Sequence, residues 1–333
     1  KPVLRSFGPD LTGLLTHDGG AFGIKTEATL RLIRAPAHTD YASFNFADLV
    51  SASAALSAIA REEIAEDIYI LDAESVNAAT QVSVAQKAQG AWAIARSGGG
   101  PLGAARALWS IAKGGLRRVP DGGYCVNVVL AGRSARGVAD DLAIARELAS
   151  RCGGDEAAPL VPRVARADLF ANLNGVLDQR GGRWAALNCK VAHSEAQAVI
   201  AGFDRIMAPH AAAMARHGIT VTRLCSALGS LAYSFECVFH WQDEWLPLHR
   251  QAAEASFLAG LTEPAANPAA RDLVATLRAD TVALFRSLGG ASNQIGRTYP
   301  FIEALSPAPA ALLRQVKATL DPKGLMNPGV LGL

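Results

Sequence analysis

The stretch that decides the fold is Leu231-Ala232-Tyr233-Ser234-Phe235-Glu236-Cys237-Val238-Phe239-His240-Trp241. Every second residue in it is large and apolar, which is the period of a β-strand that buries one face. Glu236 and His240 share the other face, where four residues of strand separate them by about 13 Å, too far for a direct acid–base pair. The pattern leaves two interpretations open: the two side chains line a cavity together, or their face is solvated.

The rest of the chain, read outward from this strand, alternates strands and helices. The patterns predict further strands at residues 41–47, 67–73, 124–130, 184–191 and 219–225 and helices at residues 48–66, 137–151 and 194–217, the last kinked at Pro209. No regular repeat is present. The order therefore predicts an α+β fold, in which helices cover one face of a largely antiparallel sheet.

Composition narrows the class of protein. The chain has 333 residues, 50% of them hydrophobic, and a net charge of +2 without a dense Lys/Arg cluster, which excludes a disordered chain and argues against nucleic acid as a partner. Its five cysteines are scattered and never form a C-x-x-C pair, as in reduced cytosolic proteins. We find no apolar run long enough to span a membrane and no signal-peptide core. We therefore expect a cytoplasmic protein, with peripheral attachment to a membrane as the alternative.

The segment from Ser97 to Gly123 is glycine-rich and basic. It is typical of a surface excursion or linker, and the alternative is a basic patch that docks an acceptor protein or a membrane surface. Residues 98–103 match G-x-G-x-x-G but follow a helical pattern instead of a strand, and residues 110–113 match S-x-x-K without its companion motifs. No zinc spacing or H-E-x-x-H is present, so we expect no metal site.

Both ends of the chain carry glycine-punctuated turns. Residues 18–24, Asp-Gly-Gly-Ala-Phe-Gly-Ile, form a bend whose free amides suit an anion or the edge of a flat heteroaromatic ring, or a tight turn between strands. Alternation predicts a half-buried strand at residues 26–32. At the other end, a polar loop at residues 289–300 precedes a helix that starts after Ser306, and residues 325–329 form a turn that holds Asn327 in place.

These two ends resemble the FAD-linked oxidases and dehydrogenases of the vanillyl-alcohol oxidase type, in the branch of D-lactate dehydrogenase (cytochrome) and the flavin subunit of glycolate oxidase. The resemblance is carried by residues 8–32 and by Leu-Asp-Pro-Lys-Gly-Leu-Met-Asn-Pro-Gly at residues 320–329. It implies that residues 1–36 end an FAD-binding domain, residues 37–290 form a substrate or cap domain, and residues 291–333 return to the FAD-binding domain.

The resemblance also implies an enzyme that oxidises a small hydroxy acid or alcohol by hydride transfer to N5 of FAD, with a quinone or cytochrome as electron acceptor. The backbone at Gly19, Gly20, Gly23 and Ile24 is then expected to touch the FAD. Asn327 is expected near the flavin ring.

For catalysis, the resemblance implies that Glu236 and His240 face the substrate cavity. Arg297 is expected to clamp a substrate carboxylate or to stabilise negative charge on the reduced flavin. Tyr299 or His240 is expected to take the proton of the substrate hydroxyl.

The sequence departs from the family pattern in two places. The metal-dependent branch carries His-Ala-Gly-Asp-Gly-Asn-x-His and Gly-Glu-His-Gly, where residues 227–232 and 292–296 here lack the histidine and glutamate ligands. The phenol-oxidising branch has a Tyr-Arg pair where Gly296 precedes Arg297.

The glycine-rich loop that grips the FAD pyrophosphate is also missing, so we expect weak FAD binding by these residues alone. For the assembly of the chain we consider two alternatives: a homodimer, or a complex in which another polypeptide supplies the FAD-binding half. The alternative function is a non-catalytic subunit that binds a ligand or partner without FAD.

Overall fold

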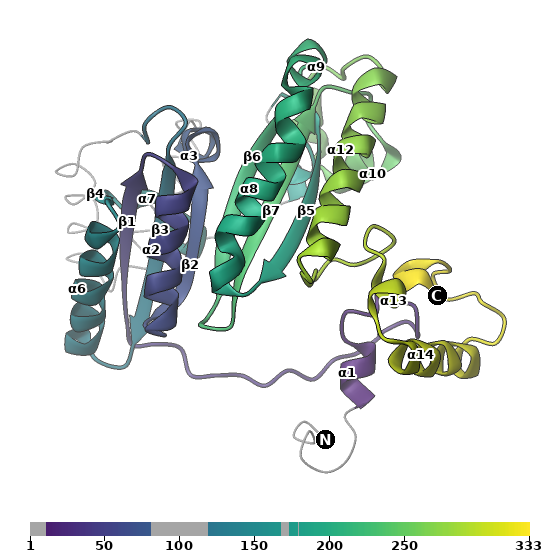
Figure 1. Ribbon diagram of the computed structural model, residues 1–333, viewed down its shortest axis with the longest axis horizontal. Helices are drawn as coiled ribbons and strands as arrows, with labels where there is room; N and C mark the ends of the chain where they lie inside the picture. Colours follow the sequence, from purple (N-terminus) through teal and green to yellow (C-terminus); the bar gives the residue numbers. More distant parts are fainter. Residues whose placement is uncertain (1–10, 81–118, 168–172, 179) are drawn as a thin grey trace. The chain divides into compact units, whose positions relative to one another are not determined.

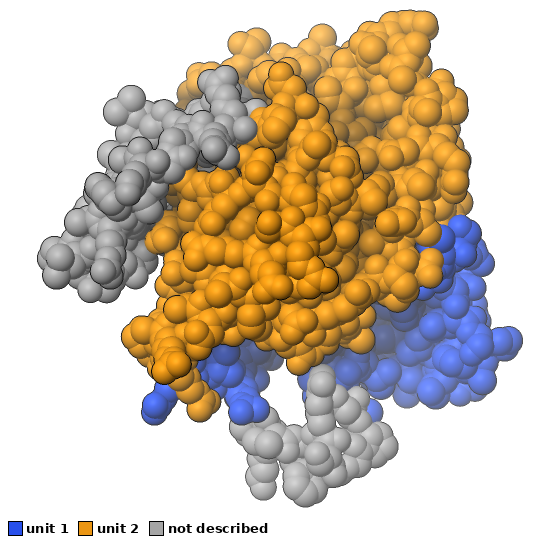
Figure 2. All heavy atoms as spheres, turned by 60° about the vertical axis from the view of Figure 1, so that its left-hand side comes forward, with its two compact units in different colours: residues 1–35, 285–333 blue, residues 36–284 orange. Residues whose placement is uncertain are grey.

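The computed structural model describes residues 11–80, 119–167, 173–178 and 180–333 (Figure 1). They form two compact units, unit 1 with residues 1–35 and 285–333 and unit 2 with residues 36–284 (Figure 2). Most of the basic segment, including the G-x-G-x-x-G and S-x-x-K motifs, lies outside the described residues.

Unit 2 is built on one seven-stranded sheet in the order β4-β1-β3-β2-β6-β7-β5. Every pairing in it is antiparallel, which confirms the expected α+β class. The strands are β1 (His38–Phe46), β2 (Ala65–Asp72), β3 (Tyr124–Gly132), β4 (Asp155–Ala157), β5 (Arg183–Val191), β6 (Thr220–Leu228) and β7 (Ala232–Trp241).

The strand pairings differ in length. β7 pairs with β6 over nine residue pairs and with β5 over nine more. By contrast, β2 and β6 pair over three, from Tyr69 opposite Ser226 to Leu71 opposite Leu224. This short pairing is the seam between two halves of the sheet, β4-β1-β3-β2 and β6-β7-β5.

Long helices cover the apolar face of both halves (Figure 1). They are α2 (Leu49–Arg61), α6 (Ala135–Arg151), α8 (Ala196–Met207) and α12 (Pro268–Ser287). A side chain at Gly202 in α8 would come within 2.6 Å of Leu284 in α12, so glycine lets these two helices pack closely. The chain leaves the α-helix at Pro209, in the 3-10 turn between α8 and α9 (Ala211–Arg216), as expected.

Shorter helices complete unit 2. They are α3 (Ala73–Thr80), α7 (Leu160–Ala167), α10 (Pro247–Ala252) and α11 (Ala255–Ala259). Among them, α3 packs on the sheet's other face, where Ala73 and Val76 share a buried cluster with Cys125. No helix among the described residues combines the length and the hydropathy that crossing a bilayer requires.

The core confirms the expected alternation over residues 232–241, whereas Leu231 precedes β7 and is 81% exposed, against the prediction. Tyr233, Phe235, Cys237 and Phe239 are fully buried. Phe203 of α8 packs on this face, with its ring centroid 5.3 Å from that of Phe235 and 6.3 Å from that of Phe239.

Unit 1 contains α1 (Leu11–Leu15), α13 (Phe301–Ala304), α14 (Pro307–Leu320) and a 3-10 turn at Val330–Gly332. The prediction of a half-buried strand at residues 26–32 is wrong. This segment has no regular secondary structure, and Leu30 and Leu32 are 80% and 90% exposed. A strand needs a neighbour to bond its backbone, and none of the described residues pairs with this segment.

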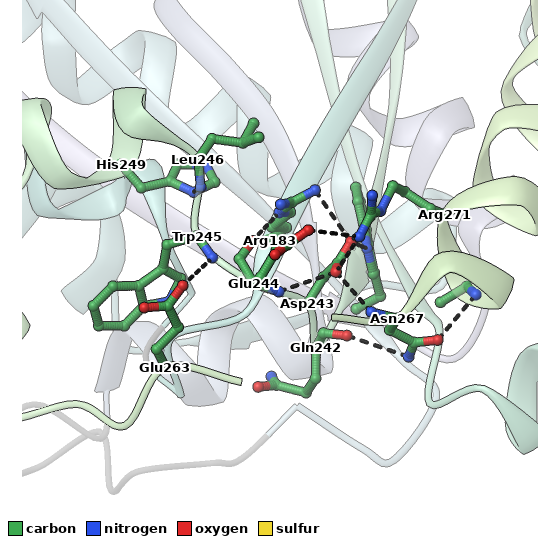
Figure 3. A network of polar contacts seen from close by, with 12 residues as sticks. Arg183, Gln242, Asp243, Glu244, Trp245, Leu246, His249, Glu263, Asn267 and Arg271 are labelled. Atoms are coloured by element: carbon green, nitrogen blue, oxygen red, sulfur yellow. Dashed lines mark hydrogen bonds and ion pairs between the residues drawn. The ribbon is translucent and has the colours of Figure 1, made fainter. Parts of the chain in front are cut away.

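A buried carboxylate, Asp243, joins β5, β7 and α12 (Figure 3). It is completely buried and bonds two arginines: Arg183 of β5 at 3.1 Å and Arg271 of α12 through two nitrogens, both at 2.9 Å. It also accepts hydrogen bonds from the Asn267 backbone at 2.8 Å and from the Trp241 indole at 3.1 Å. One charged side chain thus fixes where the helix starts relative to two strand ends.

These contacts determine the charge state of Asp243. Burial by itself raises the pKa of the carboxyl, but the bonds from Arg271, the Asn267 amide and Trp241, with the charge of Arg183, outweigh it and lower the pKa to about 2. Because the folded-state pKa lies below the ordinary 3.8, the stabilisation is present above that pH and is lost as the pH falls towards 2.

We predict that Asp243→Asn lowers the free energy of unfolding by about 3 kcal/mol at pH 7, because it leaves Arg183 buried without its counter-charge. Urea unfolding measures this loss, and Asp280→Asn, an exposed carboxyl on the same helix, is the control. The difference between wild type and Asp243→Asn should shrink as the pH falls from 4 to 2. Equal losses in both variants would contradict the role given to Asp243.

Candidate functional site

The two ends of the chain meet in unit 1. Asn327 donates a hydrogen bond from Nδ2 to the carbonyl of Gly19 at 2.6 Å. Ala21 forms a buried cluster with Val330 and Leu331. Gly19 has a φ of +60°, and a side chain there would come within 2.7 Å of Val330, so both conformation and packing require glycine at this position.

A lysine–aspartate pair holds the two ends together. Lys317 of α14 bonds the carbonyls of Ala21 and Met326 and the carboxylate of Asp321, each at 2.7 Å. Asp321 also accepts the amides of Leu325 at 2.9 Å and Met326 at 2.8 Å. The bond from Lys317, followed by that from the Met326 amide, lowers the pKa of Asp321 to about 2, so the pair is ionised at neutral pH.

The glycine bend does not present the free amides expected from its sequence. Asp18 accepts hydrogen bonds from the amides of Gly20 at 3.1 Å and Phe22 at 3.0 Å, and it pairs with Lys25. Burial raises the pKa of Asp18, but these bonds together lower it, so the bend carries its own carboxylate. Gly23 differs, because a side chain there would meet no atom within 4 Å and its surroundings are open.

Arg297 lies beside the Asn327 turn. It is exposed and donates to the carbonyl of Pro328 at 2.7 Å, and the amide of Leu331 donates to Gly296 at 2.9 Å. Tyr299, two residues on, is partly buried. The loop with both residues therefore packs against the turn inside unit 1, and Arg297 keeps further donors for a ligand.

Glu236 and His240 lie in unit 2, on the sheet face opposite the aromatic core. Both are partly buried, and the alternate residues of β7 are buried on the other side. The Nε2 atom of His240 lies 2.9 Å from the hydroxyl of Thr222 in β6, and Glu236 stands opposite Asn188 in β5. Lys190 of β5 donates to Asn188 at 2.8 Å, which adds a cation to this face.

Burial shifts the pKa of each of three titratable groups of this face, Glu236, His240 and Lys190, towards the neutral form. It raises the pKa of Glu236, a shift that the charge of Lys190 opposes. It lowers the pKa of His240 more than the carboxylates of Asp178, Glu74 and Asp72 raise it. A neutral imidazole can accept a proton at pH 7, which is what a general base requires.

The expected site residues therefore form two groups, each inside one unit. Gly19, Gly20, Asn327 and Arg297 gather in unit 1, and Glu236 and His240 share a face in unit 2. The second group has further polar members that the sequence analysis missed: Thr222, Asn188 and Lys190. The alternation of residues in β5 and β6 would identify these three residues as members of the same face, but only once the register with β7 is known.

Within the described part of the chain, no three His, Cys, Asp or Glu side chains gather where they could hold a metal ion. Residues 227–232 and 292–296, which lack the family's ligands, are among those described.

The fold is similar to that of solved structures of other proteins. Two structures of alkyldihydroxyacetonephosphate synthase align over 98% of this chain and 51% and 50% of their own, with TM-scores of 0.58 and 0.56 and identities of 15% and 16%. A 4-ethylphenol oxidase from Gulosibacter chungangensis, in an isoeugenol complex, aligns over 98% of this chain and 59% of its own, with a TM-score of 0.54 and 13% identity. The chain thus spans about half the length of these structures, and at such identities they show the fold alone.

No functionally curated protein sequence matches the chain. A family model does: that of the FAD linked oxidases, C-terminal domain, matches residues 35–218 and 301–331, well over half of the chain. The first matched segment includes Asn188 and Lys190 and the second includes Asn327 and its turn, whereas Glu236, His240, Arg297 and residues 18–24 lie outside both. The chain belongs to the FAD linked oxidases, as their C-terminal domain, and FAD is the cofactor of that family.

Proposed function

We propose that the chain is the substrate-binding part of an FAD-dependent oxidoreductase that oxidises a small hydroxy acid or alcohol. The observation that carries the proposal is the polar face of β5, β6 and β7 in a member of an FAD-linked family. This face offers a base, a carboxyl group and a cation, in His240, Glu236 and Lys190. These are the groups that binding and deprotonating a polar alcohol require.

The residues of unit 1 fit one part of FAD, the edge of its flavin ring. The Nδ2 of Asn327 donates to the carbonyl of Gly19, and its Oδ1 can accept a hydrogen bond from a ligand. Arg297 donates to the carbonyl of Pro328 and has further N–H groups that can donate to a ligand. The open backbone at Gly23, followed by the exposed Ile24, allows a flat group to approach. The amides of Gly20 and Phe22 are bound by Asp18, so they offer nothing to a pyrophosphate.

When bound, FAD supplies the acceptor for a hydride. The chain's own residues supply the rest. His240, held in orientation by Thr222, takes the proton of the substrate hydroxyl, or Tyr299 does so. Arg297 binds a carboxylate in two-pronged geometry or balances negative charge on the cofactor, and Lys190 adds positive charge on the sheet face.

The same proposal includes a quinone or cytochrome as electron acceptor and a cytoplasmic localisation of the enzyme. All five cysteines are free, four of them buried, which suits a reducing compartment. The second candidate function is a non-catalytic, partner-binding subunit. The observation that favours it is Asp18, whose carboxylate occupies amides in the glycine bend and adds negative charge where an anionic cofactor would approach.

We predict that the purified chain takes up FAD weakly and saturably, with a dissociation constant above about 1 μM, because the described residues fit only the ring edge. Titration of flavin fluorescence measures it. Asn327→Leu should weaken binding about tenfold, whereas Asn293→Leu, in the neighbouring loop, should not. Absence of any uptake would shift the assignment to the partner-binding subunit.

We predict that flavin reduction in the FAD-loaded protein loses rate as the pH falls through the pKa of His240. That pKa lies below the ordinary 6.5, so the rate at pH 7 is already at its plateau. His240→Gln should slow reduction about 100-fold and abolish this acid limb. His38→Gln, at an exposed position of β1, is the control. An acid limb that persists unchanged in His240→Gln would assign the base elsewhere.

We predict that Arg297→Ala slows reduction by D-lactate and glycolate about 100-fold, while Arg297→Lys restores part of the rate. Stopped-flow flavin absorbance over a substrate panel measures this, with 4-ethylphenol included as a substrate without a carboxylate. Equal rates for wild type and Arg297→Ala on every hydroxy acid would reject the role. Reduction by the phenol alone would overturn the proposed substrate class.

A further inference from the structure

A cavity of about 320 Å³ lies in unit 2 on the helix-covered side of the sheet. It opens between α2 and the start of α8 and is lined in part by Ser53, Ser57, Arg61, His193, Ser194 and Gln197. Its volume lies at the lower end of the range for small-molecule sites. None of these residues belongs to the substrate site proposed above.

The cavity and that substrate site lie on opposite faces of the sheet. Ser53 hydrogen-bonds the hydroxyl of Tyr233 at 2.7 Å, and Tyr233 points to the core side of β7. Glu236 and His240 alternate with it and point the other way. A ligand in the cavity therefore occupies a second site, separate from the proposed substrate site on the other face of the sheet.

Part of the cavity wall is polar, beside the apolar side chains of Val50, Ala54 and Ala196. His193 is 8% exposed and Ser57 6% exposed, and the imidazole Nδ1 lies 2.9 Å from the Ser57 hydroxyl. The other ring nitrogen, Nε2, lies 3.2 Å from the carbonyl of Gly229. Because a carbonyl only accepts, we assign the proton of the neutral ring to Nε2, and Ser57 then donates to Nδ1. The oxygen of Ser57 is left with lone pairs that can accept a hydrogen bond from a ligand hydroxyl.

The charge of the lining has one sign. Among the described residues that line it, Arg61 is the one with a charged side chain and is exposed, and none is acidic. A guanidinium beside hydroxyl and amide side chains matches an oxyanion that also carries hydroxyl groups.

We propose that this cavity is an effector site for a small hydroxylated oxyanion, a carboxylate or a phosphate ester, which Arg61 binds by charge and Ser57 by a hydrogen bond. Arg61 and Ser57 belong to α2, which packs on β2 and β3 in one half of the sheet and on β6 in the other, and His193 follows β5, so the ligand links α2 to the segment that begins α8. Binding therefore stabilises unit 2 as well as occupying the site.

Calorimetric titration of the full chain without FAD tests the proposal, using inorganic phosphate, glycerol 3-phosphate and glycerate as anionic probes and glycerol as the neutral one. We expect saturable binding of glycerol 3-phosphate or glycerate, with an accompanying rise in melting temperature, and none of glycerol. The choice between the two identifies a phosphate or a carboxylate as the preferred anion.

The variants separate the cavity from general surface charge. Arg61→Gln should weaken binding at least tenfold. Arg151→Gln removes an equivalent charge, because Arg151 also lies exposed in the last turn of a helix, and it should have no effect. Ala54→Trp, at an exposed position of the lining, should block the cavity without disturbing the core.

If Arg61→Gln and Arg151→Gln weakened the binding of the anionic probes equally, the binding would be non-specific charge attraction, and the proposal of a site would be wrong. An unchanged affinity in Ala54→Trp, or no saturable binding of any anionic probe at 10 mM, would also overturn it. The outcome is independent of the proposed redox function, since no cofactor or turnover is involved.

Discussion

The geometry of unit 2 depends on one buried carboxylate, Asp243. The residue follows β7, the central strand of its half of the sheet, and it fixes both the first residue of β5 and the start of α12. Taking a carboxylate out of water is costly, and the two arginines, two backbone amides and an indole that surround it compensate for that cost. Since β7 also carries Glu236 and His240, the same node orients the strand that presents the proposed catalytic groups.

Unit 1 uses the same principle at smaller scale. Lys317 and Asp321, one helical turn apart, satisfy the backbone of the Leu325–Asn327 turn and reach across to Ala21 near the other end of the chain. More than 290 residues separate Lys317 from Ala21 in sequence. A charged pair placed on a helix end therefore closes the unit where apolar contacts are few, because the buried cluster there is small.

Much of unit 2 could be predicted from the sequence because alternation and burial agree there. The buried residues of β7 and the break at Pro209 follow directly from the local pattern. Asp243 could not be predicted, since an acidic residue just after a strand looks like any solvated turn until its partners, 60 residues upstream and 28 downstream, are brought to it. Long-range ion pairs leave no periodic trace.

The errors in unit 1 have physical causes too. Residues 26–32 alternate like a strand, but alternation describes the faces of a strand and cannot supply the neighbour that it needs. The glycine bend was expected to offer free amides, yet Asp18, the first residue of the same motif, accepts two of them. Local polar side chains compete with ligands for backbone amides. In this motif Asp18 is the competing side chain, and the amides that it binds are those expected to bind a ligand.

The short seam between β2 and β6 has a consequence for how the protein folds. The β6–β7 hairpin is local in sequence and can form early, whereas the seam joins residues more than 150 positions apart through three residue pairs. α2 crosses this seam, because it packs on both β2 and β6 and its Ser53 bonds Tyr233 of β7. The seam would then form late on the folding pathway, together with the docking of α2 onto β6 and β7.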